Sequence, residues 1–191
     1  MGLLAAAALG VAAAAFAKET PTVGKAAPTF ALPDEQGTTH RLEDYRGRLV
    51  VLEWTNPECP YVARHYRADT MEKLASRFGE QVVWLAVNST HDNTPEESRA
   101  WKQEQGFSYP TLQDPDGTVG HLYGATTTPD LFVIDAEGRL RYAGAIDDDP
   151  RGRAETASNY VSAAIEKILA GKGPDPSQTR PYGCSVKYGD K

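Results

Sequence analysis

The sequence is organised around a short buried strand that ends in a cysteine-bearing turn. The run from Leu49 to Trp54 (LVVLEW) is almost wholly apolar, which predicts a buried strand. A polar turn follows it and places Cys59 directly before Pro60. Because proline has no N–H and a φ angle suited to the first helical turn, this order predicts that Cys59 is the N-cap of the next helix.

The predicted position of Cys59 favours a reactive thiol. A free cysteine has a pKa of about 8.5, and the unpaired N–H groups and the dipole at a helix N-terminus lower that pKa by one to several units. The alternative is a buried structural cysteine, which is common beside apolar runs. The polar residues of the turn, Thr55 to Glu58, predict instead that the sulfur reaches the surface.

The first 17 residues predict an export signal. They carry no charged side chain, have an apolar core of signal-peptide length and end in Ala15-Phe16-Ala17, the small-x-small pattern of a cleavage site. They lack the usual basic residue near the start, so either the start codon is placed late or the segment is an uncleaved anchor. A bilayer core needs about 20 strongly apolar residues, so no stable membrane span is expected. We expect export to the periplasm or the extracellular space.

Composition and charge fit one globular domain, residues 22–170, followed by a tail, residues 171–191, that carries Cys184. The chain has 191 residues, of which 40% are hydrophobic and 24% charged. Its formal net charge of -6 gives no electrostatic reason to expect nucleic acid as a partner. Cys59 and Cys184 have no further cysteine at metal-ligand spacing, so we expect neither a metal nor another cofactor.

The order of the predicted elements indicates an α/β domain with a central mixed β-sheet flanked by helices. An N-terminal β-hairpin comes first, and strands then alternate with amphipathic helices before a second hairpin and a final helix. Thr94-Pro95-Glu96-Glu97 combines an N-cap, a first-turn proline and a capping-box glutamate. The predicted strands cover residues 28–32, 38–42, 49–54, 82–87, 109–112, 130–135 and 139–146, and the predicted helices run from Cys59 to Gly79 and over residues 95–105, 118–123 and 154–170.

These segments together resemble the thioredoxin fold of the redoxin group. The resemblance covers about residues 22–170 and rests on LVVLEWT leading to Cys59-Pro60, on TTTPDLFVID, and on the hairpin through RYAGAIDD. The group includes the AhpC/TSA peroxiredoxins and the TlpA-like exported thiol-disulfide oxidoreductases. The similarity is greatest to a peroxiredoxin-like branch with a Cys-Pro-aromatic-Val sequence and a C-terminal PYGCSVKY segment.

The resemblance implies roles for residues around the cysteine. Cys59 matches the nucleophilic first cysteine of the thioredoxin Cys-X-X-Cys motif, and Val62 stands in place of the second. Thr128-Pro129 matches the cis-proline motif beside the reactive cysteine, so Thr128, Pro129 and Pro60 are the expected substrate-binding residues. A trans proline that begins a strand is the alternative for Pro129.

Glu53 is the third expected catalytic residue, with Cys59 and Cys184. It lies six positions before Cys59, where thioredoxins keep a buried acid that assists proton transfer. Burial in an apolar strand raises the pKa of a carboxyl, which suits proton transfer near neutral pH. A core carboxyl satisfied by backbone donors is the alternative.

Two enzymatic functions remain open on the residues alone. In the first, the Cys59 thiolate attacks a protein disulfide, and Cys184 or an external thiol reductant resolves the mixed disulfide. In the second, Cys59 attacks a peroxide, becomes a sulfenic acid and condenses with Cys184. Peroxiredoxins place Thr or Ser three residues before their cysteine and an arginine near the later strand, whereas this chain has Asn56 and TTTPDLF. The first function is therefore favoured.

Two functions of another class are also open. Cys59, Cys184 and His65 are candidate ligands of a soft cation such as Cu(I), although the chain has no Met-rich or His-rich tract. A binding module without turnover would instead use a structural disulfide between Cys59 and Cys184 to staple the tail. Reduction potential separates this last function from thiol-disulfide exchange, because structural disulfides typically lie below about -300 mV.

Overall fold

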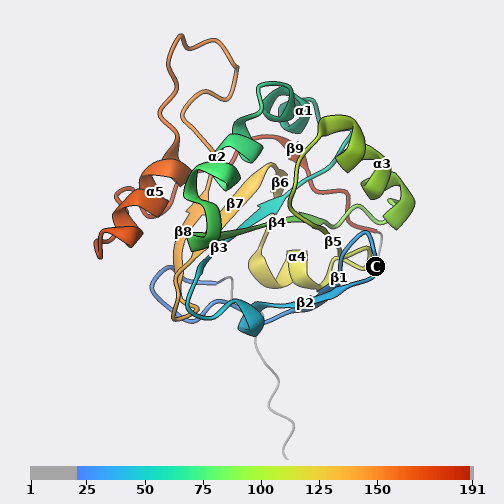
Figure 1. The fold of residues 1–191 in the computed structure, drawn as a ribbon. Coiled ribbons are helices and arrows are strands. Elements are labelled where there is room, and N and C mark those ends of the chain that lie inside the picture. Colours follow the sequence, from blue (N-terminus) through green and yellow to red (C-terminus); the bar gives the residue numbers. More distant parts are fainter. Residues whose placement is uncertain (1–20, 190–191) are drawn as a thin grey trace, which may run out of the picture.

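The strand predicted at residues 49–54 is the central strand of the sheet in the computed structural model, which describes residues 21–189. The five-stranded sheet has the order β5-β4-β3-β7-β8 (Figure 1). Strand β3 runs parallel to β4 and antiparallel to β7, so the sheet is mixed, as predicted. The strands of this sheet are β3 (Leu49–Trp54), β4 (Val82–Asn88), β5 (Thr111–Gln113), β7 (Asp130–Ile134) and β8 (Leu140–Gly144).

Helices cover one face of the sheet, and the N-terminal hairpin with one short helix covers the other (Figure 1). The first face packs against α1 (Pro60–Arg67), α2 (Thr70–Phe78), α3 (Pro95–Gln105) and α5 (Tyr160–Leu169). The second face packs against the hairpin β1 (Ala31–Pro33) and β2 (Thr39–Arg41), the turn η1 (Leu42–Tyr45), and α4 (Thr118–Tyr123). The predicted α/β architecture is therefore confirmed.

The helix predicted from Cys59 to Gly79 is two helices, and this prediction was wrong. Asp69 lies between α1 and α2 with a φ of 59°, in the left-handed region, which interrupts the helical hydrogen bonds. Aspartate tolerates this conformation better than most residues. The apolar spacing continues across the break, because Tyr66 and Met71 on either side are both buried, so periodicity alone does not reveal it. A short turn, η2 (Gly79–Gln81), follows α2.

The last helix begins later than predicted. Its N-cap is Asn159, whose side chain accepts a hydrogen bond from the backbone N–H of Ser162 at 2.7 Å. Residues 147–158 instead form a loop that rises beside α1 (Figure 1). Helix α3 keeps the predicted capping box between Thr94 and Glu97. No helix among residues 21–189 is long and apolar enough to cross a membrane. The predicted export signal lies outside the described residues.

The C-terminal tail crosses one end of the sheet. Thr179 N–H first bonds the carbonyl of Ala143 in β8 at 3.1 Å. The tail strand β9 (Cys184–Ser185) then pairs antiparallel with β6 (Thr127–Thr128), a short strand just before β7. Beyond it, the carbonyl of Lys187 accepts the N–H of His91, past the end of β4, at 3.0 Å. The tail therefore lies across the end of the sheet that carries the cysteine-bearing turn.

Candidate active site

Cys59 begins α1, as the sequence predicts. It is the N-cap, with Pro60 in the first helical position, and its carbonyl accepts the N–H of Ala63 at 2.9 Å. The turn that delivers it is shaped by Asn56, whose side chain accepts the N–H of Glu58 at 2.7 Å and whose carbonyl accepts the N–H of Cys59 at 3.0 Å. The sulfur thus lies where the first turn of a helix favours negative charge.

Cys59 does not reach the surface, so that prediction was wrong. Only 2% of the residue is exposed, and its Sγ–H donates to the carbonyl oxygen of Thr128 at 2.9 Å. The polar turn would expose the thiol if nothing lay over it. The tail segment that contains Tyr182 and Cys184 packs against the core cluster that includes Cys59. The sequence next to Cys59 contains no signal of this distant cover.

The tail that covers Cys59 carries the second thiol of the chain, Cys184. In the β6–β9 pair Cys184 lies opposite Thr128, the residue that accepts the Cys59 hydrogen bond. Both cysteines are reduced, and the two thiols interact with each other. The tail therefore brings together two sulfurs that are 125 positions apart in the chain, as their numbers show.

The two thiols have opposite acidities. Burial alone would raise the pKa of Cys59, but interactions with the side chains of Thr128 and Cys184 and with the N–H of Val62 outweigh it and lower this pKa. Burial, together with the neighbouring Cys59 sulfur, raises the pKa of Cys184 to about 11. Cys59 is thus the thiol that ionises first, and Cys184 retains its proton.

Gly183 allows the tail to approach the site so closely. Its φ is +149°, and a Cβ built there would lie 2.0 Å from the carbonyl oxygen of Thr128. Real Cβ atoms essentially never come within 3.0 Å of another heavy atom in this way. Only glycine therefore fits where the tail crosses the Thr128 carbonyl.

The peptide bond between Thr128 and Pro129 is cis, as the resemblance implies. Both residues are buried beneath the tail. The next residue, Asp130, is also buried, and its carboxylate accepts the N–H of Thr126 at 3.2 Å. Burial raises the pKa of Asp130 to about 7. Sequence analysis missed Asp130, although a carboxylate that heads an apolar strand is the same signal that singled out Glu53.

Glu53 is fully buried in β3, on the face of the sheet that carries the Cys59 core cluster. Its Oε2 accepts a hydrogen bond from the indole Nε1–H of Trp84 at 2.9 Å. Its Oε1 has no hydrogen-bond partner among residues 21–189, so the alternative of a carboxyl satisfied by backbone donors is wrong. Burial raises the pKa of Glu53 to about 7, and the bond from Trp84 offsets only part of this effect.

A polar network holds the tail beside Cys59, and no pattern in the sequence indicates it. The Tyr182 hydroxyl donates to Asp147 and accepts a hydrogen bond from Arg64 Nη2 at 3.1 Å. The same Arg64 nitrogen lies 3.1 Å from His65 Nε2, which lies 3.2 Å from the Tyr182 hydroxyl. Burial lowers the pKa of His65, so its imidazole is held neutral with Nε2 as an acceptor. These side chains come from α1, the 147–158 loop and the tail.

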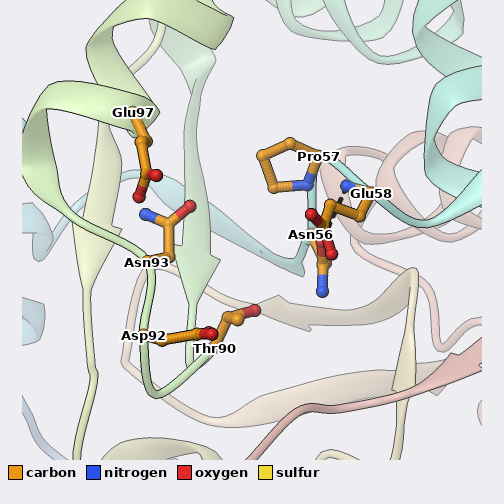
Figure 2. A pocket seen from close by; sticks show the side chains of 7 residues that line it. All are labelled: Asn56, Pro57, Glu58, Thr90, Asp92, Asn93 and Glu97. Atoms are coloured by element: carbon orange, nitrogen blue, oxygen red, sulfur yellow. Dashed lines mark hydrogen bonds between the residues drawn. The ribbon is translucent and has the colours of Figure 1, made fainter.

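A polar pocket of about 260 Å³ lies on the far side of the cysteine-bearing turn (Figure 2). Glu58 on the turn, Asp92 and Glu97 give it three carboxylates, and no basic side chain lines it. Figure 2 shows the turn and the segment around residues 90–97 facing each other across the opening. This side of the site therefore favours neutral or positively charged groups.

Comparisons with known proteins agree with this geometry. Residues 23–143 match the AhpC/TSA family. A Mycobacterium tuberculosis protein named "Putative peroxiredoxin MT2597" is 30% identical over 146 residues, covering 74% of this chain and 87% of that protein. The thiol-disulfide oxidoreductase ResA of Geobacillus thermodenitrificans is 33% identical over 131 residues, covering 65% and 70%.

The fold extends beyond the matched family region. The crystal structure of a hypothetical protein from Sinorhizobium meliloti superposes with a TM-score of 0.82 at 29% identity. That match covers 91% of this chain and 98% of the other. Together with the family match and the likeness to thiol:disulfide interchange proteins of solved structure, it confirms the predicted thioredoxin-like fold, and the superposed part is longer than the region matched to the family.

Proposed function

Since the chain belongs to the AhpC/TSA family of thioredoxin-fold redox proteins, we propose that it is an exported thiol-disulfide oxidoreductase with Cys59 as nucleophile and Cys184 as resolving cysteine. The observation that supports the proposal best is the pairing of β6 with β9. It holds Cys184 opposite Thr128, whose carbonyl accepts the Cys59 thiol. Val62 stands where the thioredoxin Cys-X-X-Cys motif has its second cysteine, and in the proposed mechanism Cys184 of the tail takes the role of that cysteine.

The proposed reaction proceeds in two exchanges. The Cys59 thiolate attacks one sulfur of a substrate disulfide, so that a Cys59–substrate disulfide forms and the other substrate sulfur leaves as a thiolate that takes up a proton. The Cys184 thiol then loses its proton and attacks Cys59 Sγ, which forms the Cys59–Cys184 disulfide and releases the second substrate thiol. The substrate is reduced by two electrons, and the cysteine pair is oxidised by two. An external thiol reductant restores the pair.

The pKa values of the two thiols indicate which cysteine attacks the substrate first. Attack needs a thiolate, and the lowered pKa of Cys59 supplies one, whereas the raised pKa of Cys184 keeps this thiol protonated until Cys59 is engaged. In the proposed mechanism Glu53, with a pKa of about 7, exchanges protons with the cysteine pair. Thr128, Pro129 and Pro60 surround the nucleophile and are the proposed substrate contacts.

A thiol peroxidase is the second candidate function, and the similarity to the Mycobacterium tuberculosis protein supports it. It uses the same pair: Cys59 attacks a peroxide oxygen, becomes a sulfenic acid, and condenses with Cys184 with loss of water. The surroundings of Cys59 favour it less. The nearest arginine on α1, Arg64, is occupied by Tyr182 and by the carbonyls of Asp149 and Pro150.

Trapping experiments distinguish the two functions. The full chain with Cys184→Ser is exposed separately to insulin, a protein disulfide, and to hydrogen peroxide, and Cys59 is then analysed by mass spectrometry. Thiol-disulfide exchange predicts a mixed disulfide with insulin that forms faster than sulfenic acid forms with peroxide. The opposite order supports the peroxidase. An unmodified Cys59 under both treatments contradicts both functions, and Cys59→Ser is the control for background oxidation.

Export is tested on the protein made with its complete N-terminal sequence. We propose export from the signal-like residues 1–17. The expected result is a protein in the periplasmic or extracellular fraction whose first residue is Lys18. Full-length protein in the membrane fraction would indicate an uncleaved anchor, and retention inside the cell would contradict export.

A further inference from the structure

A basic groove lies on the α1 side of the Cys59 turn. Its volume is about 510 Å³. Four arginines and no acidic residue line it, although the chain as a whole carries a formal net charge of -6. The groove runs between the first two turns of α1 and the 147–158 loop, and its lining residues are Pro60, Tyr61, Arg64, Arg67, Pro150, Arg151 and Arg153.

Three acidic side chains next to this groove accept hydrogen bonds from other groups of the protein. Asp148 and Asp149, on the loop itself, accept the backbone N–H groups of Ser158 at 2.8 Å and of Ala154 at 2.9 Å. Asp147 accepts the Tyr182 hydroxyl and the N–H of Asp149. These bonds engage the carboxylates of Asp147, Asp148 and Asp149, whereas Glu155, on the same loop, is exposed and does not line the groove.

The groove arginines consequently have no ion-pair partner. Within residues 21–189, no carboxylate lies within 4.0 Å of a charged nitrogen of Arg64, Arg67, Arg151 or Arg153. Arg64 donates hydrogen bonds to the Tyr182 hydroxyl and to the carbonyls of Asp149 and Pro150. The other three arginines are exposed. The exposed guanidinium groups of Arg67, Arg151 and Arg153 are suited to bind carboxylates in bidentate geometry, and Arg64 adds positive charge beside them.

The groove leads to both cysteines. Pro60, in its lining, directly follows Cys59. Tyr61 and Pro150 also line a second hollow, of about 670 Å³, that follows the tail as far as Gly183, the residue before Cys184. Asp147, Asp148 and Arg180 line this hollow too, so the basic lining is confined to the groove itself. A chain segment bound along the arginines therefore lies beside the tail segment that covers Cys59.

Charge is distributed unequally around the nucleophile. The pocket on the opposite side of the turn carries Glu58, Asp92 and Glu97 (Figure 2), whereas the α1 side carries the four arginines. An acidic segment is attracted to one side and repelled from the other. The opposite charges on the two sides of the turn therefore orient a charged peptide relative to Cys59.

From these observations we propose that the groove formed by Arg64, Arg67, Arg151 and Arg153 binds an acidic peptide segment next to the disulfide that Cys59 attacks. This inference rests on the proposed thiol-disulfide function and assigns its substrate class. Binding of the acidic segment raises the encounter rate and lowers KM, and the effect weakens as salt is added.

The test compares three peptide disulfides of one length that differ only in the residues flanking the cysteine: Asp and Glu, Ser and Gln, or Lys. Full-length protein is expected to reduce the acidic peptide with the highest kcat/KM and the lysine peptide with the lowest. In Arg67→Ser/Arg151→Ser/Arg153→Ser the ratio of acidic to lysine peptide is expected to fall about tenfold, the effect of three partly screened ion pairs. Both peptides are measured with the same preparation of each protein, so a partly unfolded fraction lowers both kcat/KM values equally and leaves their ratio unchanged.

Two further variants sharpen the result. Arg151→Glu/Arg153→Glu is expected to reverse the preference, and Lys25→Gln/Arg41→Gln, which removes two exposed charges from the N-terminal segment and β2, is expected to leave it unchanged. An unchanged ratio in the triple variant, or an equal loss in the Lys25/Arg41 control, overturns the inference.

Failure of the proposed function gives a different result. If the wild-type protein reduces none of the three peptides, binding of fluorescent acidic and lysine peptides in which serine replaces cysteine is measured by anisotropy. Salt-sensitive binding of the acidic peptide that is lost in the triple variant supports the groove without the reaction. Equal binding of both peptides overturns it.

Discussion

Cys59 donates its thiol hydrogen to the carbonyl oxygen of Thr128 at 2.9 Å, across 69 positions of sequence. The same Thr128 lies opposite Cys184 in the β6–β9 pair. One residue thus contacts the nucleophile through its carbonyl and the proposed resolving cysteine through strand pairing. Disturbing either contact is expected to change the chemistry of both thiols.

Replacing Cys184 is expected to raise the pKa of Cys59. The Cys184 thiol is one of the hydrogen-bond donors that lower the pKa of Cys59, so Cys184→Ala removes a stabiliser of the thiolate. The thiolate absorbance of Cys59 at 240 nm, followed against pH, measures this change in the variant and in the wild type. An identical midpoint in both proteins would show that the helix N-terminus alone sets the acidity.

Removing the charge of Glu53 is expected to change the pH dependence of stability. The pKa of Glu53 rises from 4.5 to about 7 on folding, so the folded protein binds this proton more tightly than the unfolded chain does. The contribution of Glu53 to stability is therefore most favourable below pH 4.5, falls as the pH rises to about 7, and is then constant. The shift corresponds to a cost on the order of 3 kcal/mol above pH 7.

Glu53→Gln cannot ionise, so the part of this decline that Glu53 causes is expected to disappear and the part due to Asp130 to remain, while disulfide reduction near neutral pH becomes slower. Urea unfolding of both proteins at several pH values measures the first effect, and insulin reduction measures the second. Asp130→Asn is the matched comparison, because Asp130 has a similar pKa but faces the other side of the sheet. An unchanged rate with a large loss of stability in Glu53→Gln would favour a purely structural role.

A methyl group at Gly183 is expected to lift the tail from the site. Gly183→Ala would place a Cβ 2.0 Å from the Thr128 carbonyl oxygen in a backbone conformation that alanine rarely adopts. The exposure of Cys59 should then increase, and iodoacetamide should label it about tenfold faster. A tenfold increase corresponds to a decrease of about 1.4 kcal/mol in the free energy of opening the tail. Gly173→Ala is the control, because a Cβ there meets nothing within 4 Å. Equal labelling rates in the two variants would mean that the tail does not protect Cys59.

Removing the Tyr182 hydroxyl is expected to loosen the same segment from its other end. Tyr182→Phe deletes the hydroxyl that bonds Asp147 and accepts from Arg64, at a cost of about 1 to 3 kcal/mol. Amide hydrogen exchange of residues 180–186 should become faster, whereas exchange in β3 and β4 should not change. Tyr61→Phe is the matched control: the Tyr61 ring contacts Tyr182, but its hydroxyl has no hydrogen-bond partner among the described residues. Faster exchange in both variants would assign the effect to ring packing.

Features set by neighbouring residues could be predicted from the sequence. The order Cys59-Pro60 specifies a helix start, Thr94 to Glu97 specifies a capping box, and an apolar run specifies a buried strand, because each depends on local backbone geometry. The family resemblance added the cis bond before Pro129, which no local preference determines.

Features set by distant contacts could not be predicted. Cys59 is buried because the tail returns over it, and Tyr182 is fixed by side chains from two other elements. The break at Asp69 is local but leaves the apolar spacing intact, so it carries no periodic signal. The basic groove combines arginines of α1 with arginines almost 90 positions later, and only the folded chain shows that they line one hollow.

The pairing of β9 with β6 makes the tail a competitor of the substrate. A peptide that adds as a strand beside Thr127 and Thr128 needs the backbone groups that Cys184 and Ser185 already occupy. Because the tail is covalently attached, it is present at an effective concentration in the millimolar range, whatever the protein concentration. A substrate must therefore bind with additional contacts outside this edge to displace it, and weakly binding disulfides leave Cys59 covered.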